Sequence, residues 1–222
     1  MIQSSAPTPK RIIEAFAPPI VGLAARRIVG SVNYRSHVLF DGDDTLFKDE
    51  AARVHVYGEY GCGKSTKWVL NNTHSLVIAV DTSSEWVSSV ENDNKKNNGR
   101  LNIHHADLGQ VGRWGCPLSY ERISNFSDYT DYIWKQEDRP TLVLVDGRFR
   151  VCCFLTSLKF ADPGTKIIFD DYTNRPHYHF VEKYAQRVRQ CGRQCLFIVP
   201  PRNDIDVDEL DRDIAAFRNV MD

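Results

Sequence analysis

The chain has 222 residues, of which 42% are hydrophobic and 26% are charged, which is ordinary for a soluble globular protein and enough for one substantial α/β domain. Its formal net charge of −1 provides no overall positive field that would attract nucleic acid or an anionic membrane, so no nucleic-acid partner is expected. The six cysteines form no CxxC pair, which argues against a zinc site and favours reduced thiols in a cytoplasmic protein.

The N-terminal part, residues 1–50, is expected to be a helical appendage. Its segment "RIIEAFAPPIVGLAARRIV", residues 11–29, is interrupted by a glutamate, two prolines and two arginines, so no transmembrane span is expected. The segment predicts two short helices that pack on the domain or on a neighbouring subunit, which makes it a candidate dimerisation arm for a homodimer. A targeting segment or a membrane-surface helix is the alternative.

A phosphatase-like pattern follows at residues 38–47. "VLFDGDDTLF" fits D-x-D-x-T, the aspartyl-phosphate motif of haloacid-dehalogenase-like phosphatases, with Asp41 as the nucleophile. Short Asp/Gly/Thr patterns also arise as turns and helix caps. Because this pattern precedes a complete glycine-rich unit that a phosphatase would not need, a turn or a cap is favoured.

From residue 51 onward, short β-rich runs alternate with helical stretches. The strand candidates are 54–57, 75–80, 101–105, 141–145, 165–169 and 195–199. The helix candidates lie around 64–71, 83–91, 127–137, 150–159 and 176–190, with an amphipathic helix near the C-terminus. This alternation predicts one Rossmann-like, doubly wound and mostly parallel sheet over residues 51–222. Ligands of such sheets bind at the carboxyl ends of the strands.

The stretch "VHVYGEYGCGKST", residues 54–66, fits two different nucleotide sites. Counted from Gly58 it is G-x-x-x-x-G-K-S, a P-loop in which Lys64 and Ser65 would hold phosphates and magnesium. Counted from Glu59 it is E-x-G-x-G, the glycine-rich turn of a dinucleotide- or S-adenosylmethionine-binding unit.

Acidic residues after the predicted strands decide between these two interpretations. They are Glu59, Asp81, Asp107, Asp146 and the pair Asp170-Asp171. A P-loop leaves the first three without a role, and an acid inside a phosphate cradle is electrostatically unfavourable. S-adenosylmethionine carries a sulfonium and an ammonium group, so an acidic rim would favour its binding. The methyl-donor turn is therefore preferred.

The ordered set "GEYGCGKST", "VDTSSEW", "ADLGQVGRWGCP", "VLVDGRFRVCC" and "IIFDDYTNRPHYHFVE" resembles class I S-adenosylmethionine-dependent methyltransferases, and more closely a group of methyltransferase-like proteins. The resemblance covers about residues 50–185. It implies a cofactor site made of Glu59, Gly61, Gly63, Ser65, Asp81 and Asp107. In that site Asp81 would hold the ribose hydroxyls and Asp107 would lie by the adenine amino group.

The candidate catalytic residues are Asp146, Asp170 and His177. Asp146, Asp170 and Asp171 resemble the acidic set by which catechol-type O-methyltransferases hold magnesium, which would orient two substrate oxygens and lower the pKa of a hydroxyl. The alternative is an internal ion-pair network with the arginines of "DGRFR" and Arg175. His177 is a candidate general base, since a histidine titrates near neutral pH.

The expected function is methyl transfer from S-adenosylmethionine to an oxygen of a small or medium-sized acceptor, driven mainly by positioning. A non-catalytic methyltransferase-like protein that acts through partners and a P-loop NTPase are the alternatives. An enzyme should have an open acceptor pocket, whereas in a non-catalytic protein "GRWGCP" would fill it.

Overall fold

The computed structural model describes residues 38–40 and 43–222. The predicted helices of residues 11–29, with the candidate dimerisation arm, and Asp41 of the phosphatase-like pattern lie outside these ranges. In the part that is described, no helix is long and apolar enough to cross a membrane.

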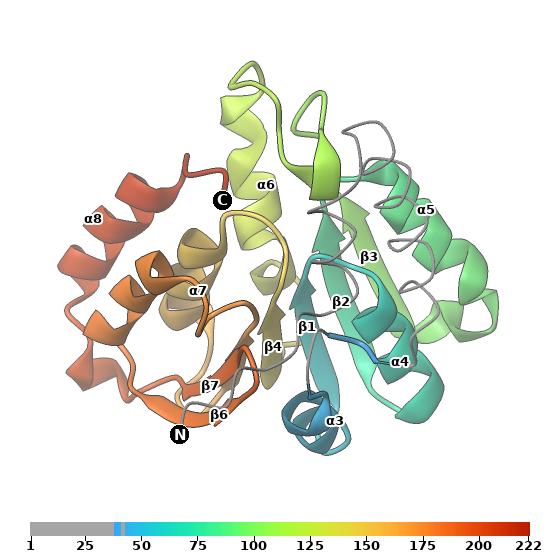
Figure 1. The fold of residues 1–222 in the computed structure, drawn as a ribbon, viewed down its shortest axis with the longest axis horizontal. Helices are drawn as coiled ribbons and strands as arrows, with labels where there is room; N and C mark the ends of the chain where they lie inside the picture. The colour runs from blue at the N-terminus through green and yellow to red at the C-terminus, as the bar shows by residue number, and fades with distance from the viewer. Residues whose placement is uncertain (1–37, 41–42) are drawn as a thin grey trace, which may run out of the picture. The chain divides into compact units, whose positions relative to one another are not determined.

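Seven strands form one sheet in the order β3-β2-β1-β4-β5-β7-β6 (Figure 1). The strands are β1 (Val56–Tyr60), β2 (Leu76–Asp81), β3 (Leu101–His105), β4 (Leu142–Val145), β5 (Lys166–Phe169), β6 (Arg187–Cys191) and β7 (Gln194–Ile198). Strands β1 to β5 run parallel, whereas β7 is antiparallel to both of its neighbours. The predicted Rossmann-like, mostly parallel sheet is confirmed.

Helices cover the two faces of this sheet. Helices α4 (Lys64–Asn72) and α5 (Ser84–Asp93) pack on one side, and α6 (Phe126–Asp131), α7 (Arg150–Phe160) and α8 (Val207–Phe217) on the other (Figure 1). The short 3-10 helices are Lys95–Arg100, Arg113–Gly115, Ile123–Asn125, Tyr132–Trp134, Pro176–Lys183 and Arg202–Asp204. Because both faces are covered, the central strand β4 is buried at every position, which explains its continuous apolar run.

Side chains that cap the N-termini of α5 and α8 fix where these two helices begin. The hydroxyl of Ser83 accepts from the backbone N–H of Trp86 at 3.4 Å, which caps the N-terminus of α5. The carboxylate of Asp206 accepts from the N–H of Glu209 at 2.9 Å and caps α8 in the same way. The predicted helices after β2 and near the C-terminus are thus confirmed.

Helix α3 (Thr45–Ala51) belongs to the same compact unit as the sheet, which runs over Phe40–Asp222. Its Glu50 carboxylate lies 2.5 Å from the ammonium group of Lys166 on β5. The ring of Phe47 packs edge-on against Tyr57 of β1. The α/β unit therefore includes this helix, which the sequence assigned to the appendage of residues 1–50.

The predicted helix of residues 176–190 is wrong. A 3-10 helix ends at Lys183, and residues 187–191 form the edge strand β6, which pairs with β7. Gly192 has φ +56° in the turn between the two strands, a conformation that favours glycine. Because β6 buries neither face, its sequence "RVRQC" lacks the apolar alternation that would have indicated a strand.

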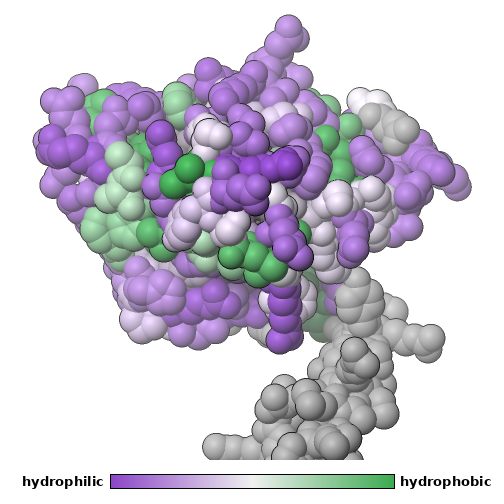
Figure 2. Space-filling model, turned by 90° about the horizontal axis from the view of Figure 1, so that it is seen from above, coloured by the Kyte–Doolittle hydropathy of each residue, from purple (hydrophilic) through white to green (hydrophobic). Residues whose placement is uncertain are grey.

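The neighbouring strands β1 and β4 form the topological switch point of the sheet. The chain continues from β1 to β2 in one direction and from β4 to β5 in the other. In open α/β sheets of this kind, ligands bind outside the carboxyl ends of the strands at this point. Viewed from that side, the surface is mainly hydrophilic with scattered hydrophobic patches (Figure 2).

Candidate functional site

The turn of residues 61–63 joins β1 to α4 at the switch point. Gly61 has φ +90°, and a Cβ at this residue would lie 2.8 Å from the Cα of Gly147 in the turn after β4. The two turns therefore touch through their backbones, and only glycine permits this approach. Around Gly63, by contrast, the described residues leave a Cβ position with no heavy atom within 4 Å. The turn is therefore tightly packed at Gly61 and open at Gly63.

Glu59 is fully buried at the end of β1 and holds the start of α4. Its carboxylate accepts hydrogen bonds from the hydroxyls of Ser65 and of Thr66, the latter at 2.6 Å. Burial raises the pKa of Glu59 to about 7, although these hydroxyls oppose the shift. The sequence predicts both Glu59 and Ser65 as cofactor-binding residues, and in the structure their side chains are hydrogen-bonded to each other.

The same contacts bear on the P-loop interpretation. Gly58 lies inside β1, paired with Ile78 and Val143, and a Cβ there would lie 2.9 Å from the ring of Pro140. Only residues 61–63 separate the strand from the helix. A P-loop cradles phosphates with the whole loop from its first glycine onward and uses its serine hydroxyl for magnesium. Here the first glycine is in the sheet and the hydroxyl of Ser65 is bonded to Glu59.

Asp81 ends β2 and is bonded to the glycine turn. One carboxylate oxygen accepts from the backbone N–H of Cys62 at 2.8 Å, and the other accepts from that of Ser83 at 2.7 Å. Burial raises the pKa of Asp81, while the two backbone donors oppose this shift. Each oxygen of an ionised carboxylate can accept more than one hydrogen bond, so acceptor capacity for a ligand hydroxyl is left.

Asp107 follows β3 and is exposed. Its carboxylate accepts from the N–H of Gly109 at 3.1 Å and forms an ion pair with Arg122. These two partners lower the pKa of Asp107, with the backbone donor contributing most. The structure therefore brings Glu59, Asp81 and Asp107 to one edge of the sheet in adjacent strands.

A segment of the long loop after β3 covers the end of β2. The hydroxyl of Thr82 donates to the carbonyl oxygen of Gly115 at 2.6 Å. A Cβ on Gly115 would lie 3.6 Å from a carboxylate oxygen of Asp81. Trp114 has φ +61° in the same turn, and its side chain is exposed. Residues 112–117, which include "GRWGCP", thus lie directly beside the predicted ribose-binding acid.

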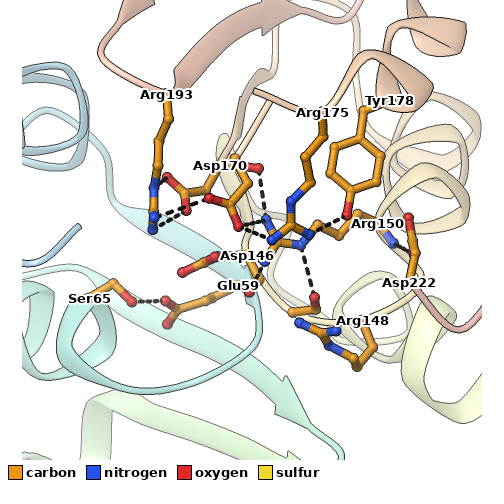
Figure 3. Close-up of polar contacts among 12 residues, drawn as sticks. Glu59, Ser65, Asp146, Arg148, Arg150, Asp170, Arg175, Tyr178, Arg193 and Asp222 are labelled. Atoms are coloured by element: carbon orange, nitrogen blue, oxygen red, sulfur yellow. Dashed lines mark hydrogen bonds and ion pairs between the residues drawn. The ribbon is translucent and has the colours of Figure 1, made fainter. Parts of the chain in front are cut away.

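Arg150 is the centre of a second group of side chains, at the ends of β4 and β5 (Figure 3). Its guanidinium group is buried and lies 3.1 Å from a carboxylate oxygen of Asp146 and 3.3 Å from one of Asp171. It also donates to the carbonyl oxygens of Gly147 and Asp170, at 3.0 and 2.8 Å. These contacts fix the two turns relative to each other.

Two further arginines complete the group. Arg193 pairs with Asp170 through two contacts, of 3.2 and 2.7 Å, and with Asp171 at 3.1 Å. Arg175 pairs with Asp171 at 2.8 Å. Asp171 has φ +57°, a left-handed conformation that is uncommon for aspartate. Figure 3 shows these side chains converging on the acids from different elements.

Three carboxylates therefore face three guanidinium groups, and the cluster is formally neutral. Among the described residues, no group of three or more His, Cys, Asp or Glu side chains could hold a metal ion. The donor set of Asp146, Asp170 and Asp171 does not fit magnesium, because arginines already occupy the positions that a cation would take. The ion-pair network that the sequence left as an alternative matches the geometry better.

His177 is not brought to this cluster. Its exposed ring packs edge-on against Tyr178, with 4.3 Å between ring centroids, at the start of a 3-10 helix. Asp146 is only partly buried, and its pKa is raised well above the usual value by burial and by the neighbouring Asp170. Of the three candidate catalytic residues, Asp146 is the one at the switch point with exposed surface.

Several members of the site gave no signal in the sequence. Asp222, at the C-terminus, accepts from the backbone N–H of Arg150 at 2.9 Å. The hydroxyl of the buried Tyr129 accepts from the N–H of Arg148 at 3.0 Å. Arg193 comes from the turn between β6 and β7. These residues reach the site from remote parts of the chain, so no motif spacing contains them.

Among solved structures, a methyltransferase-like protein from Silicibacter pomeroyi is 27% identical to this chain, with a TM-score of 0.73 over 84% of this chain and 98% of that one. The cofactor-bound protein Rv0187 from MTB is 13% identical, with a TM-score of 0.53 over 88% and 99%, and shows the fold alone. The N-methyltransferase NodS from Bradyrhizobium japonicum, in complex with S-adenosyl-L-homocysteine, is 13% identical, with a TM-score of 0.46 over 72% of this chain and 90% of that one. No protein-family model and no curated protein matched the chain.

The sheet topology and the similarity to the protein from Silicibacter pomeroyi define the fold class of the chain. It has the Rossmann-like fold of class I methyltransferases, and it is similar over most of its length to a methyltransferase-like protein. The resemblance to class I methyltransferase-like proteins that the sequence motifs carry is therefore confirmed.

Proposed function

We propose that the chain binds S-adenosylmethionine at the turn after β1 and transfers its methyl group to an oxygen of a small or medium-sized acceptor. The observation that carries this proposal is the fixed orientation of the Asp81 carboxylate. Backbone N–H groups of Cys62 and Ser83 orient its two oxygens, and Cys62 adjoins Gly63, the open side of the turn. A carboxylate fixed in this way is suited to accept the hydroxyl hydrogens of a ribose.

The remaining predicted cofactor residues take different roles in this proposal. Gly61 and Gly63 would line the methionine part, and Asp107 would lie near the adenine. Glu59 and Ser65 would act from beneath by fixing the first turn of α4, since their side chains bond to each other. The similarity to a methyltransferase-like protein supports this cofactor.

The cofactor supplies an activated methyl group on sulfur, so the chain itself has to position the acceptor and remove its proton. We assign the second task to Asp146, because its turn touches the glycine turn through Gly147 and its carboxylate is partly exposed. A carboxylate with a raised pKa is a better proton acceptor. Asp170 is fully buried against Arg193 and would serve only to hold this arrangement.

Calorimetric titration with S-adenosylhomocysteine tests the proposed cofactor site. The substitution Asp81→Asn should weaken binding by about tenfold or more, because hydrogen bonds to a charged acceptor are lost. The control is Asp162→Asn, in an exposed turn at the opposite edge of the sheet. An unchanged affinity in a folded Asp81→Asn variant would refute the ribose assignment.

Gly63→Ala gives a second test that leaves Asp81 intact. A methyl group at Gly63 meets no described atom within 4 Å, so the protein should fold normally. In the proposed complex, the same methyl group occupies space that the cofactor needs. Loss of S-adenosylhomocysteine binding with an unchanged melting temperature is the expected result, and unchanged binding would place the cofactor elsewhere.

The segment of residues 112–117 favours a second candidate, a non-catalytic protein in which this segment fills the site. Its Gly115 is bonded to Thr82 and lies beside Asp81. In that case the wild-type protein should not bind S-adenosylhomocysteine, whereas Thr82→Val, which removes the bond to Gly115, should restore binding. Binding by the wild-type protein would reject this candidate.

A further inference from the structure

The side chain of Arg148 differs from the other arginines at this edge of the sheet. Its Nε atom is buried, and no described residue accepts a hydrogen bond from it. Within the same part of the chain, no carboxylate pairs with its guanidinium group, whereas Arg150, Arg175 and Arg193 all face carboxylates. Buried donors in native proteins are nearly always paired, so a donor of this kind needs an explanation.

The backbone of Arg148 is held firmly. Its N–H donates to the hydroxyl of Tyr129 at 3.0 Å, and its carbonyl oxygen accepts from the thiol of Cys153 at 3.4 Å. The preceding residue, Gly147, is in contact with the glycine turn. The donor without a partner therefore belongs to a fixed turn rather than to a loose loop.

Arg148 also follows a different strand from the residues of the proposed cofactor site. The three acids of the proposed cofactor site follow β1, β2 and β3, whereas Arg148 follows β4. Figure 3 shows its guanidinium group apart from the cluster in which Asp170 and Arg193 meet. Since the acids of that cluster are already balanced by three other arginines, the charge of Arg148 is left for a ligand.

We propose that Arg148 binds an oxyanion group, a carboxylate or a phosphate, on the methyl acceptor. The guanidinium group offers its N–H donors in a planar fork that matches the two oxygens of such a group. This inference rests on the proposed function, because it assigns the β4 side of the switch point to the acceptor. Binding of the oxyanion satisfies the buried Nε–H and orients the acceptor beside Asp146.

The test uses three small probes: benzoate, its neutral analogue benzamide, and phenyl phosphate. Each is titrated into ¹⁵N-labelled protein, with and without S-adenosylhomocysteine, while the Nε–H signal of Arg148 is followed by NMR. The signal is assigned by its absence in Arg148→Gln. Benzoate or phenyl phosphate should shift it and benzamide should not. The relative affinities of benzoate and phenyl phosphate show whether a carboxylate or a phosphate is the preferred group.

Affinities of the variants complete the test. Arg148→Gln should weaken oxyanion binding by about tenfold or more, because it removes a charge-assisted bidentate contact. Arg148→Lys keeps the positive charge without the planar fork of donors, so its oxyanion affinity should lie between those of the wild-type protein and Arg148→Gln. The control Arg139→Gln removes an exposed arginine just before β4, at the opposite end of that strand from Arg148, and should have no effect.

Three results would overturn the inference. The first is the absence of any oxyanion-dependent shift of the Arg148 signal, and the second is equal binding of benzoate and benzamide. The third is a tenfold loss of S-adenosylhomocysteine affinity in Arg148→Gln, which would assign this arginine to the carboxylate of the cofactor itself. If the wild-type protein does not bind S-adenosylhomocysteine, the proposed function fails, but the titrations without it still report on Arg148.

Discussion

The buried Glu59 should make the stability of this protein depend on pH in a direction that one substitution can isolate. Its pKa is raised from 4.5 to about 7 in the folded protein because the carboxyl group is removed from water. Folding therefore favours the protonated form. The stabilising contribution is fully present below the unfolded pKa and is lost as the pH rises through the folded pKa.

The size of this effect follows from the two pKa values. The interval from 4.5 to about 7 corresponds to about 3 kcal/mol at about 1.4 kcal/mol per pH unit. Between about pH 5 and about pH 8 most of that interval is crossed, which gives a loss of about 2.5 kcal/mol in the free energy of unfolding. Glu59→Gln keeps the shape and carries no titrating proton, so its stability should lack this component.

The assay is urea unfolding of the wild-type protein and of Glu59→Gln at several pH values between about 5 and 8. Other groups titrate in both proteins, so the difference between the two unfolding free energies isolates Glu59. It should move by about 2.5 kcal/mol in favour of the variant as the pH rises. The exposed Glu85→Gln should show no such trend. A difference that stays constant with pH would refute the argument.

Three other predictions test the structure of the site. Arg150→Met should lower the free energy of unfolding by about 3–5 kcal/mol, because it removes the buried cation that pairs with Asp146 and with Asp171. The half-exposed Arg175→Met should cost less than about 1 kcal/mol in the same urea titration. Gly147→Ala should lower the melting temperature measurably by calorimetry, since its Cβ would lie 2.9 Å from the backbone nitrogen of the turn after β1. His177→Ala should leave the rate of methyl transfer, measured as S-adenosylhomocysteine formed, unchanged, because the His177 ring is exposed outside the cluster. A large loss of rate would support His177 as the general base.

The fold was accessible from the sequence because buried parallel strands leave a simple pattern. Apolar runs such as "LVIAV" and "LVLV" alternate with helical stretches, and a polar residue follows each run at the end of the sheet where parallel strands finish. The edge strand β6 was missed because it buries neither face and therefore carries no pattern. Helix α3 was assigned to the appendage because its contact with β5, between Glu50 and Lys166, joins residues far apart in the chain.

For the candidate site, the sequence predicted where the residues lie along the strands but not which contacts their side chains make. The motifs placed Glu59, Ser65 and Asp81 at the carboxyl ends of the strands. Spacing alone does not show that the side chains of Glu59 and Ser65 are hydrogen-bonded to each other. Partners such as Arg193, which comes from a distant hairpin, decide whether three acids hold a metal or pair with arginines. These choices depend on tertiary contacts and side-chain directions, which one sequence does not display.

The most direct test of the central claim is calorimetric titration of the wild-type protein with S-adenosylhomocysteine and, separately, with magnesium-ATP. The turn after β1, with Gly58 inside the sheet and Asp81 bonded to Cys62, predicts binding of S-adenosylhomocysteine alone. Binding of ATP alone, or of neither ligand, would contradict a methyl-donor site at this turn.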